Sequence, residues 1–193
     1  MIPRSGNRNF DLALARTLSK AASVLEVLPG FAYYEDYDEF NAYATPAVRR
    51  DRADGTVLFG GGLLLDLMRG KESPEVSVAA VCAHEFGHIV QFKHDLQKVV
   101  QKGQKTARRG ELQADFLAGY FAGVRKREKP DFPAAVFAAT QSKFGDLDVD
   151  SPGHHGTPAE RGAAIVKGFE AAYRQKLSLA DTIVASTNYV TAI

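Results

Sequence analysis

The sequence predicts an α+β fold. Segments with apolar residues at helical spacing occupy most of the 193 residues, whereas short aromatic and β-branched runs are grouped in the first third. Apolar residues make up 45% of the chain and charged residues 24%, which is ordinary for a globular domain with a sizeable core. We therefore expect a single domain over residues 1–193, mostly helical, with a small sheet in its N-terminal third.

The first third of the chain is expected to supply one helix and all of the strands. Residues 9–28 carry apolar side chains at helical spacing and end before a Pro-Gly pair, which predicts a helix. Three short runs bounded by acidic, Pro or Gly residues predict strands, at 31–36, 40–48 and 56–61. The apolar segment 63–70 after the glycine run predicts a short helix.

The rest of the chain predicts helices. Ser73 as cap, Pro74 as first helical residue and Glu75 in the first turn predict the start of a long helix that runs to about Gly103. Further helices are predicted at 110–128, 133–146 and 159–176, the last after a loop rich in Asp, Gly, Pro and His. The C-terminal stretch 178–193 is expected to dock as a helix, with coverage of a cleft as the alternative.

Charge and hydropathy exclude several kinds of partner. A net charge of +1 gives no electrostatic basis for binding nucleic acid or an anionic membrane. The single cysteine excludes an internal disulfide framework, and no apolar run approaches the ~20 residues of a membrane span. The N-terminus lacks the apolar segment of a signal peptide. The sequence as it stands predicts a cytoplasmic protein, or a periplasmic or secreted one if a leader has been removed, and leaves the oligomeric state open.

The segment HEFGH, residues 84–88, predicts a zinc site. It fits H-E-x-x-H, in which two histidines one helical turn apart reach the same Zn²⁺ ion. Glu85 lies off the ligand stripe, where a carboxylate can take a proton from a zinc-activated water. We therefore expect His84 and His88 as ligands of one Zn²⁺ per chain and Glu85 as the general base.

Two residues compete for the position of third ligand. His94 has the spacing of a third metzincin histidine, but Gln91 stands where that motif needs a turning glycine, and both methionines precede the site. An apolar stripe also continues past His94, so we expect an unbroken helix that carries His94 away toward solvent. Glu111 is the better candidate, because a glutamate from a second helix completes a His₂Glu site with an open fourth position.

Asp115 is expected to support the site from behind. Glu111 and Asp115 are four residues apart on the same predicted helix and share a face. A carboxylate one turn beyond a ligand can accept the second ring N–H of a zinc-bound histidine and thereby orient it. The alternative is a solvated acidic face, but the surrounding apolar residues of this helix argue against it.

These motifs resemble those of gluzincin peptidases, specifically the CAAX prenyl proteases, their bacterial heat-shock relatives and the small soluble minigluzincins. The chain also has some likeness to bacterial neutral zinc metallopeptidases. Four segments carry the resemblance in the family's order, over residues 41–169, and they read NAYATP, GTVLFGGGLLLDL, HEFGH with ELQAD, and HHGTPAERGAAIVKGF. Membrane members of this family carry transmembrane helices, which this sequence lacks.

The resemblance implies roles for three further parts of the chain. His155 and Arg161 have the spacing of the family's His-Pro motif and its arginine, and would approach the site to stabilise the oxyanion or a substrate carbonyl. Gly156 stands where the family has proline, and His154 is a competing candidate for the histidine. Residues 56–61 would form the strand on which an extended substrate peptide adds, with an ordinary core strand as the alternative.

The sequence thus predicts a zinc-dependent endopeptidase that binds a peptide or protein substrate in extended conformation. Two alternatives stay open. One is a non-catalytic zinc-stabilised binding or regulatory module, which has no need of a general base such as Glu85. The other is a processing protease dedicated to one protein, which would use the same site residues.

Overall fold

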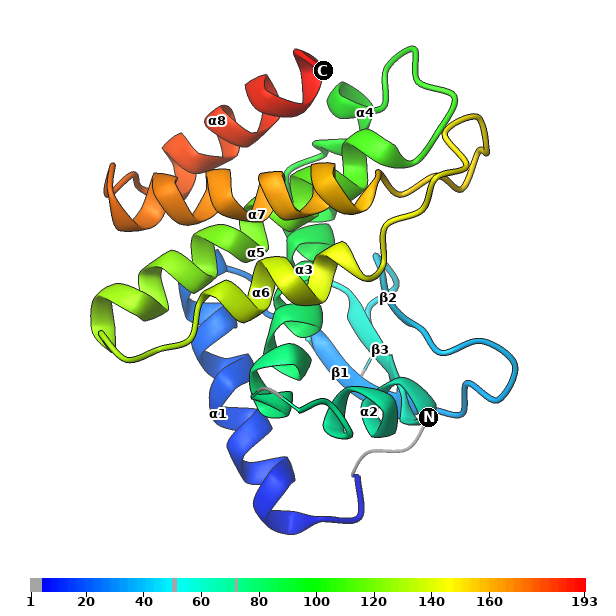
Figure 1. The fold of residues 1–193 in the computed structure, drawn as a ribbon, viewed down its shortest axis with the longest axis vertical. Helices are drawn as coiled ribbons and strands as arrows, with labels where there is room; N and C mark the ends of the chain where they lie inside the picture. Colours follow the sequence, from blue (N-terminus) through cyan, green and yellow to red (C-terminus); the bar gives the residue numbers. More distant parts are fainter. Residues whose placement is uncertain (1–4, 50–51, 72) are drawn as a thin grey trace.

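The computed structural model describes residues 5–49, 52–71 and 73–193 and has an α+β fold, in which a small sheet packs beside the central helix α3 (Figure 1). The helices are α1 (Arg8–Leu25), α2 (Gly61–Met68), α3 (Pro74–Lys93), α4 (Gln97–Val100), α5 (Arg108–Glu128), α6 (Ala135–Ser142), α7 (Pro158–Tyr173) and α8 (Leu179–Thr191). The strands are β1 (Gly30–Tyr34), β2 (Ala42–Thr45) and β3 (Thr56–Gly60). The expected α+β class, the three N-terminal strands and the C-terminal helix are confirmed.

The sheet has the order β1-β3-β2, with β3 in the centre. β3 pairs in parallel with β1 and antiparallel with β2, so that Leu58 lies opposite both Ala32 and Tyr43. Of the two alternatives for residues 56–61, the structure shows the ordinary core strand and not the strand open to a substrate, because both sides of β3 are already paired. In the sheet of the described residues, β1 and β2 are therefore the two edge strands.

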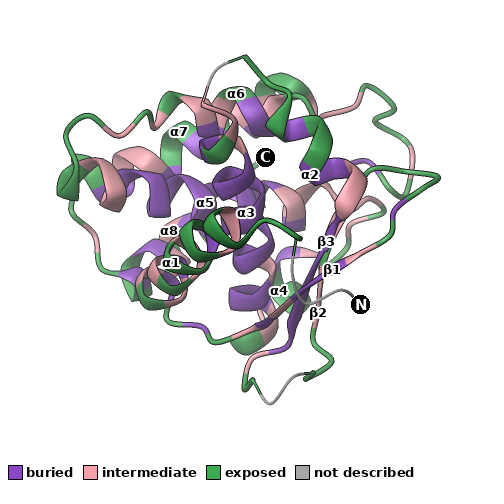
Figure 2. Cartoon of the chain, turned by 90° about the horizontal axis from the view of Figure 1, so that it is seen from below, coloured by how far each residue is buried: buried purple, intermediate pink, exposed green. Residues whose placement is uncertain are grey.

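Helices α3 and α5 form the centre of the molecule. Most of their residues are buried, which Figure 2 shows as continuous purple ribbon through the middle of the fold. The largest apolar cluster joins them to α1, β3, α6, α7 and α8. Because α3 is buried on several sides, a polar side chain on it costs free energy unless it has a partner. None of the helices in the described ranges is long and apolar enough to cross a membrane.

Helix α3 is shorter than predicted. It ends at Lys93, His94 is its C-cap and Asp95 adopts a left-handed backbone with φ of 54°. The turn brings Val100 into the interior, where it is fully buried, and leaves Val99 half exposed. A helix that continued along the predicted stripe would have buried Val99 instead. The unbroken helix to Gly103 is therefore wrong.

The start of α3 agrees with the sequence only in part. Pro74 is the first helical residue and Glu75 lies in the first turn, as predicted. Ser73 makes no side-chain capping bond, and its φ of 42° differs from the extended backbone from which a serine caps a helix. The predicted serine cap is wrong.

Helices α5 and α7 approach so closely that glycine is required between them. A Cβ atom on Gly168 would lie 1.8 Å from the main-chain oxygen of Phe116, and one on Gly119 would lie 2.1 Å from that of Ile165. Both contacts involve main chain, so neither can be relieved by moving a side chain. This contact fixes the position of α7, which carries Arg161 to the site described below.

We expect Gly168→Ala to lower the free energy of unfolding by about 1–3 kcal/mol or more, because α7 must shift to accommodate the new methyl group. Urea unfolding of the purified variant measures this effect. Gly162→Ala on the same helix is the matched control: its Cβ would meet only the hydroxyl of Ser142, at 2.8 Å. An equal loss of stability in both variants would contradict the explanation.

Candidate metal centre

Three predicted ligand side chains converge on one point between α3 and α5. His84 Nε2 lies 3.1 Å from His88 Nε2 and 3.2 Å from Glu111 Oε2, and His88 Nε2 lies 3.4 Å from Glu111 Oε1. The two histidines come from successive turns of α3, and the glutamate comes from the first turn of α5. The group can hold a metal ion.

The spacing of these atoms fits ligands around a small ion. Ligand atoms about 2.0–2.2 Å from a tetrahedral centre lie roughly 3.3–3.6 Å from one another. The three distances of 3.1–3.4 Å are close to that value. The donor set of two imidazole nitrogens and one carboxylate suits zinc and other divalent transition metals.

Asp115 holds the ring of His84 from behind. Its Oδ1 lies 2.8 Å from His84 Nδ1, and both side chains are buried. Arg161 Nε and Nη2 donate to the two oxygens of the same carboxylate at 2.7 and 3.0 Å. Since Asp115 is ionised and only accepts, Nδ1 of His84 carries a proton, and in the neutral ring that binds a metal the free electron pair is that of Nε2, which faces the centre.

His88 is oriented by Gln91, which the sequence reading missed. Gln91 Oε1 accepts from His88 Nδ1 at 2.9 Å, and the amide is completely buried. The bond again places the ring proton on Nδ1 and leaves Nε2 free. The signal was available, because Gln91 follows His88 by three residues on the same helical face.

The electrostatic field of the site favours positive charge. Burial alone would lower the pKa of His84, but the carboxylates of Asp115 and Glu111 outweigh burial and raise that pKa to about 10. Burial would raise the pKa of Glu111, and the charges of His88 and His84 instead hold that pKa well below its usual value. A divalent cation needs ionised carboxylates and a negative field around the histidine rings, and the same groups that raise the pKa of His84 provide both.

Glu85 faces the same cleft without a partner. The side chain is buried, and within the described part of the chain its Oε2 atom has no hydrogen bond. Burial raises its pKa above that of an ordinary glutamate. A carboxylate with a free oxygen and an increased proton affinity is suited to accept a proton from a molecule bound in the cleft.

Main-chain contact sets the distance between the ligand helices. A Cβ atom on Gly87 would lie 2.8 Å from the main-chain oxygen of Ala114 and 2.9 Å from its Cα. The glycine inside HEFGH thus lets α3 and α5 touch directly. His88 and Glu111 reach the same point because no side chain separates the two helices here.

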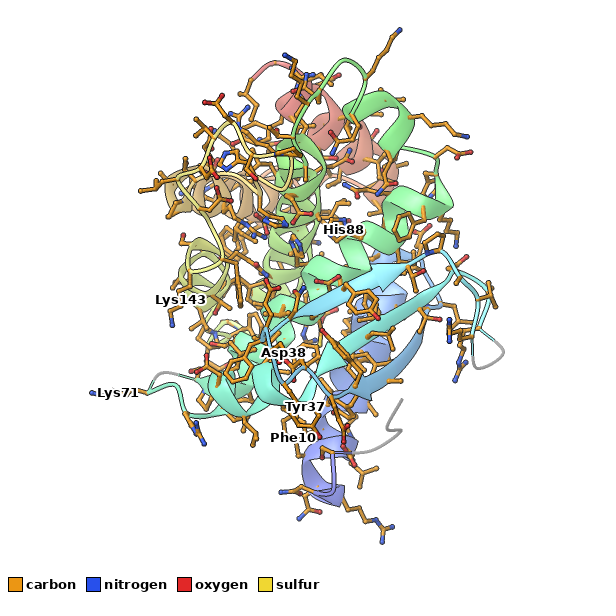
Figure 3. The ribbon with its side chains drawn as sticks, turned by 90° about the vertical axis from the view of Figure 1, so that its right-hand side faces the viewer. Phe10, Tyr37, Asp38, Lys71, His88 and Lys143 are labelled. Carbon is orange, nitrogen blue, oxygen red and sulfur yellow. The ribbon has the colours of Figure 1, made fainter. Side chains whose placement is uncertain are left out.

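The centre lies in a cleft of about 450 Å³ beside the sheet edge. Figure 3 shows His88 next to the edge of the sheet that β2 forms. Besides the residues of the centre, the cleft lining includes residues of β2, apolar residues of α2 and α3, and residues of the loop before α7, namely Ala42, Tyr43, Ala44, Leu63, Val81, Phe92, Phe144 and His155.

Of the two adjacent histidines that the sequence left open, His155 lines the cleft and is about half exposed. His154 is buried, with Nδ1 2.5 Å from Asp146 Oδ1. The other carboxylate oxygen of Asp146 accepts from the main-chain N–H of His155 at 2.9 Å. Asp146, which the sequence reading did not identify, therefore fixes the loop that presents His155.

Arg161 reaches the centre but is committed to other partners. Besides its two bonds to Asp115, it donates to the main-chain oxygen of Phe144 at 3.2 Å and to Gln141 Oε1 at 3.2 Å. Four of the five N–H groups of a guanidinium are thereby engaged. The structure thus gives Arg161 a clear role in holding Asp115, whereas its predicted contact with a substrate oxygen stays a prediction.

A capping box anchors the start of α7 near Arg161. Thr157 Oγ1 accepts from the main-chain N–H of Glu160, and Glu160 Oε2 accepts from that of Thr157. Arg108 of α5 pairs with the same glutamate and lowers the pKa of Glu160 to about 2. The first turns of α5 and α7, which carry Glu111 and Arg161, are thus tied together.

His94 lies outside the group of ligand atoms. It is exposed at the C-cap of α3 and does not line the cleft. The prediction that it faces solvent is confirmed, although the helix ends there instead of continuing past it.

We expect Glu111→Ala to lose stoichiometric Zn²⁺ after dialysis and His94→Ala to retain it as wild type does. The reason is that, in the part of the chain that the structure describes, Glu111 and not His94 completes the group of three ligand atoms. Metal analysis of the two purified variants, after equal exposure to Zn²⁺ and buffer exchange, measures the difference. Loss of metal from His94→Ala with retention in Glu111→Ala would reverse the assignment.

No family model, curated protein or solved structure matches this chain. The resemblance to gluzincin peptidases therefore depends on the sequence motifs, and the geometry described above is independent of it.

Proposed function

We propose that the chain is a zinc-dependent endopeptidase of gluzincin type. The observation that carries the proposal is the convergence of His84 Nε2, His88 Nε2 and the two carboxylate oxygens of Glu111, at 3.1–3.4 Å, beside the Oε2 atom of Glu85, which has no hydrogen-bond partner among the described residues. A purely structural zinc site closes its fourth position with another protein ligand and needs no free base.

His84, His88 and Glu111 would hold the Zn²⁺ ion, which when bound supplies a polarising charge for the scissile carbonyl and lowers the pKa of water to about 7. Glu85 accepts a proton from the attacking water and later delivers it to the nitrogen of the leaving amine. Asp115 and Gln91 keep both rings in the tautomer that leaves Nε2 available. His155, which lines the same cleft, would donate to the developing oxyanion.

The edge strand β2 provides the substrate-binding surface in this proposal. Ala42, Tyr43 and Ala44 of β2 line the cleft, and among the described strands β2 is paired on one side only, with β3. An extended peptide can add there as a further strand, with affinity from main-chain hydrogen bonds and preference from the apolar wall. This role was predicted for residues 56–61 and passes to β2 because β3 is paired on both sides.

The pairing of Arg161 with Asp115 favours an endopeptidase, which cuts within a peptide, over a carboxypeptidase, which removes its C-terminal residue. A carboxypeptidase needs a free cation that binds the substrate carboxylate, and Arg161 is buried with its charge paired to Asp115. Other charged side chains of the cleft lining include the acidic Glu39, which would repel a terminal carboxylate.

The test is cleavage of an unstructured peptide library by the Zn²⁺-loaded protein, after chelation, and after Zn²⁺ is restored. We expect internal cuts that stop on chelation and return with Zn²⁺, and the cut sites would give the side-chain preference directly. A protein that holds one Zn²⁺ per chain and cuts no library peptide would refute the general endopeptidase. It would leave a dedicated processing protease or a zinc-stabilised binding module.

A further inference from the structure

We infer that the C-terminal helix α8 belongs to the metal centre: a buried amide relay, Gln91–Gln113, orients the ligand His88 and is itself held by hydroxyl groups of α8. The relay consists of His88, Gln91, Gln113, Ser186 and Thr187 and crosses three helices. This inference depends on the proposed zinc site and assigns new positioning residues to it.

The first link of the relay has only one possible amide orientation. Gln91 Nε2 donates to the main-chain oxygen of Gly110 at 2.7 Å and to Gln113 Oε1 at 3.1 Å. A main-chain oxygen can only accept, so the nitrogen of Gln91 must face it. Gln91 Oε1 therefore points to His88 Nδ1 and can only accept the ring proton, at 2.9 Å.

The second link is fixed from the far end. The hydroxyls of Ser186 and Thr187 each donate to the main-chain oxygen of Ile183, both at 2.9 Å. Their oxygens are then left as acceptors for Gln113 Nε2, at 3.3 and 2.9 Å. With the nitrogen of Gln113 turned toward α8, its oxygen faces Gln91 and completes a chain of bonds with one direction.

Burial makes this direction costly to reverse. Gln91, Gln113 and Ser186 have no exposed surface. Flipping the amide of Gln91 would place its oxygen against the main-chain oxygen of Gly110, which would lose its donor, and flipping that of Gln113 would place two amide nitrogens against each other, at a cost of about 1–3 kcal/mol for each lost partner. The fold thus selects the Nδ1–H tautomer of His88 from a helix that has no residue in the cleft lining.

The two ligand histidines consequently differ in what supports them. His84 donates to the ionised Asp115, whereas His88 donates to a neutral amide whose position depends on α8. This difference supplies an internal control, because damage to the relay should affect the ring of His88 and spare that of His84.

The experiment compares Gln91→Leu, the double variant Ser186→Ala/Thr187→Val and the control Thr191→Val. The hydroxyl of Thr191 lies on the same helix but bonds only to main-chain oxygens of α8. We measure the Kd for Zn²⁺ by competition with a chromophoric chelator, and by NMR the solvent exchange of both histidine ring N–H protons in the Zn²⁺-loaded protein.

We expect Gln91→Leu to weaken Zn²⁺ binding about 10- to 100-fold. The double variant should weaken it by a smaller factor and accelerate exchange of the His88 ring proton alone, and Thr191→Val should match wild type. The relay is refuted if the double variant folds and keeps both the wild-type Kd and the slow His88 exchange, or if exchange at His84 accelerates equally. Wild-type protein that binds Zn²⁺ without cleaving peptides would overturn the proposed function and leave the relay intact.

Discussion

Glu85→Gln is expected to keep bound Zn²⁺ and lose about 10²- to 10⁴-fold in kcat/KM, because an amide cannot accept the proton of the attacking water. The metal is retained because Glu85 is not among the converging ligands. Peptide hydrolysis by wild type and variant is compared at matched metal content, with peptides chosen from the library cuts.

The same variant should also be no less stable than wild type. Burial raises the pKa of Glu85, so the ionised carboxylate destabilises the fold. That penalty is absent below the unfolded pKa of about 4.3 and complete above the raised folded pKa, and a neutral amide removes it. Glu75→Gln, in the exposed first turn of the same helix, is the control and should leave turnover unchanged and lower stability by no more than about 0.3–1 kcal/mol, through the lost interaction with the helix dipole. Full activity in Glu85→Gln would end the mechanism.

Asp115→Asn is expected to lower the free energy of unfolding of the metal-free protein by about 3–5 kcal/mol. The substitution preserves shape and removes the charge that compensates Arg161, which is buried. It should also weaken Zn²⁺ binding about 10- to 100-fold, since His84 loses its ionised partner. Urea unfolding in chelator and Zn²⁺ titration measure the two effects separately.

A second substitution distinguishes charge from shape. Asp115→Asn combined with Arg161→Gln removes both charges and should recover a large part of the stability, because an unpaired buried charge costs more than the loss of the whole pair. The metal affinity should remain low in the double variant, since the partner of His84 is still missing. No recovery of stability would show that the cost of Asp115→Asn has another cause than the charge of Arg161.

The parts of the site that follow from local helical geometry were predictable from the sequence. His84 and His88, and Glu111 and Asp115, are pairs separated by four residues, so each pair shares a helix face in any fold that forms the helix. Their convergence required only that the two helices pack face to face, which the apolar residues around Glu111 already indicated.

The parts that depend on distant pairing were not predictable. The apolar stripe through Leu96 and Val99 suggested a continued helix. The helix ends instead, and Val100 is buried in a cluster with Leu112, Ala164 and Val190 from other helices, which local spacing does not reveal. The identity of the edge strand depends on which side of β3 pairs with β2. The spacing of three residues between His88 and Gln91 was visible in the sequence, but the partners that hold the Gln91 amide, Gly110 and Gln113, come from α5 and depend on how the helices pack.

The contact of Gly87 with the main chain of Ala114 has a consequence for how such a protein can diversify. Two backbones in direct contact keep His88 and Glu111 in register whatever happens to the side chains that line the cleft. Leu63, Val81 and Phe144 can therefore be exchanged without moving the ligand atoms. Under the proposed function, the residues that bind the metal and those that select the peptide can therefore change independently. Substitutions of the apolar lining residues should alter which peptide bonds are cut and leave the metal affinity unchanged.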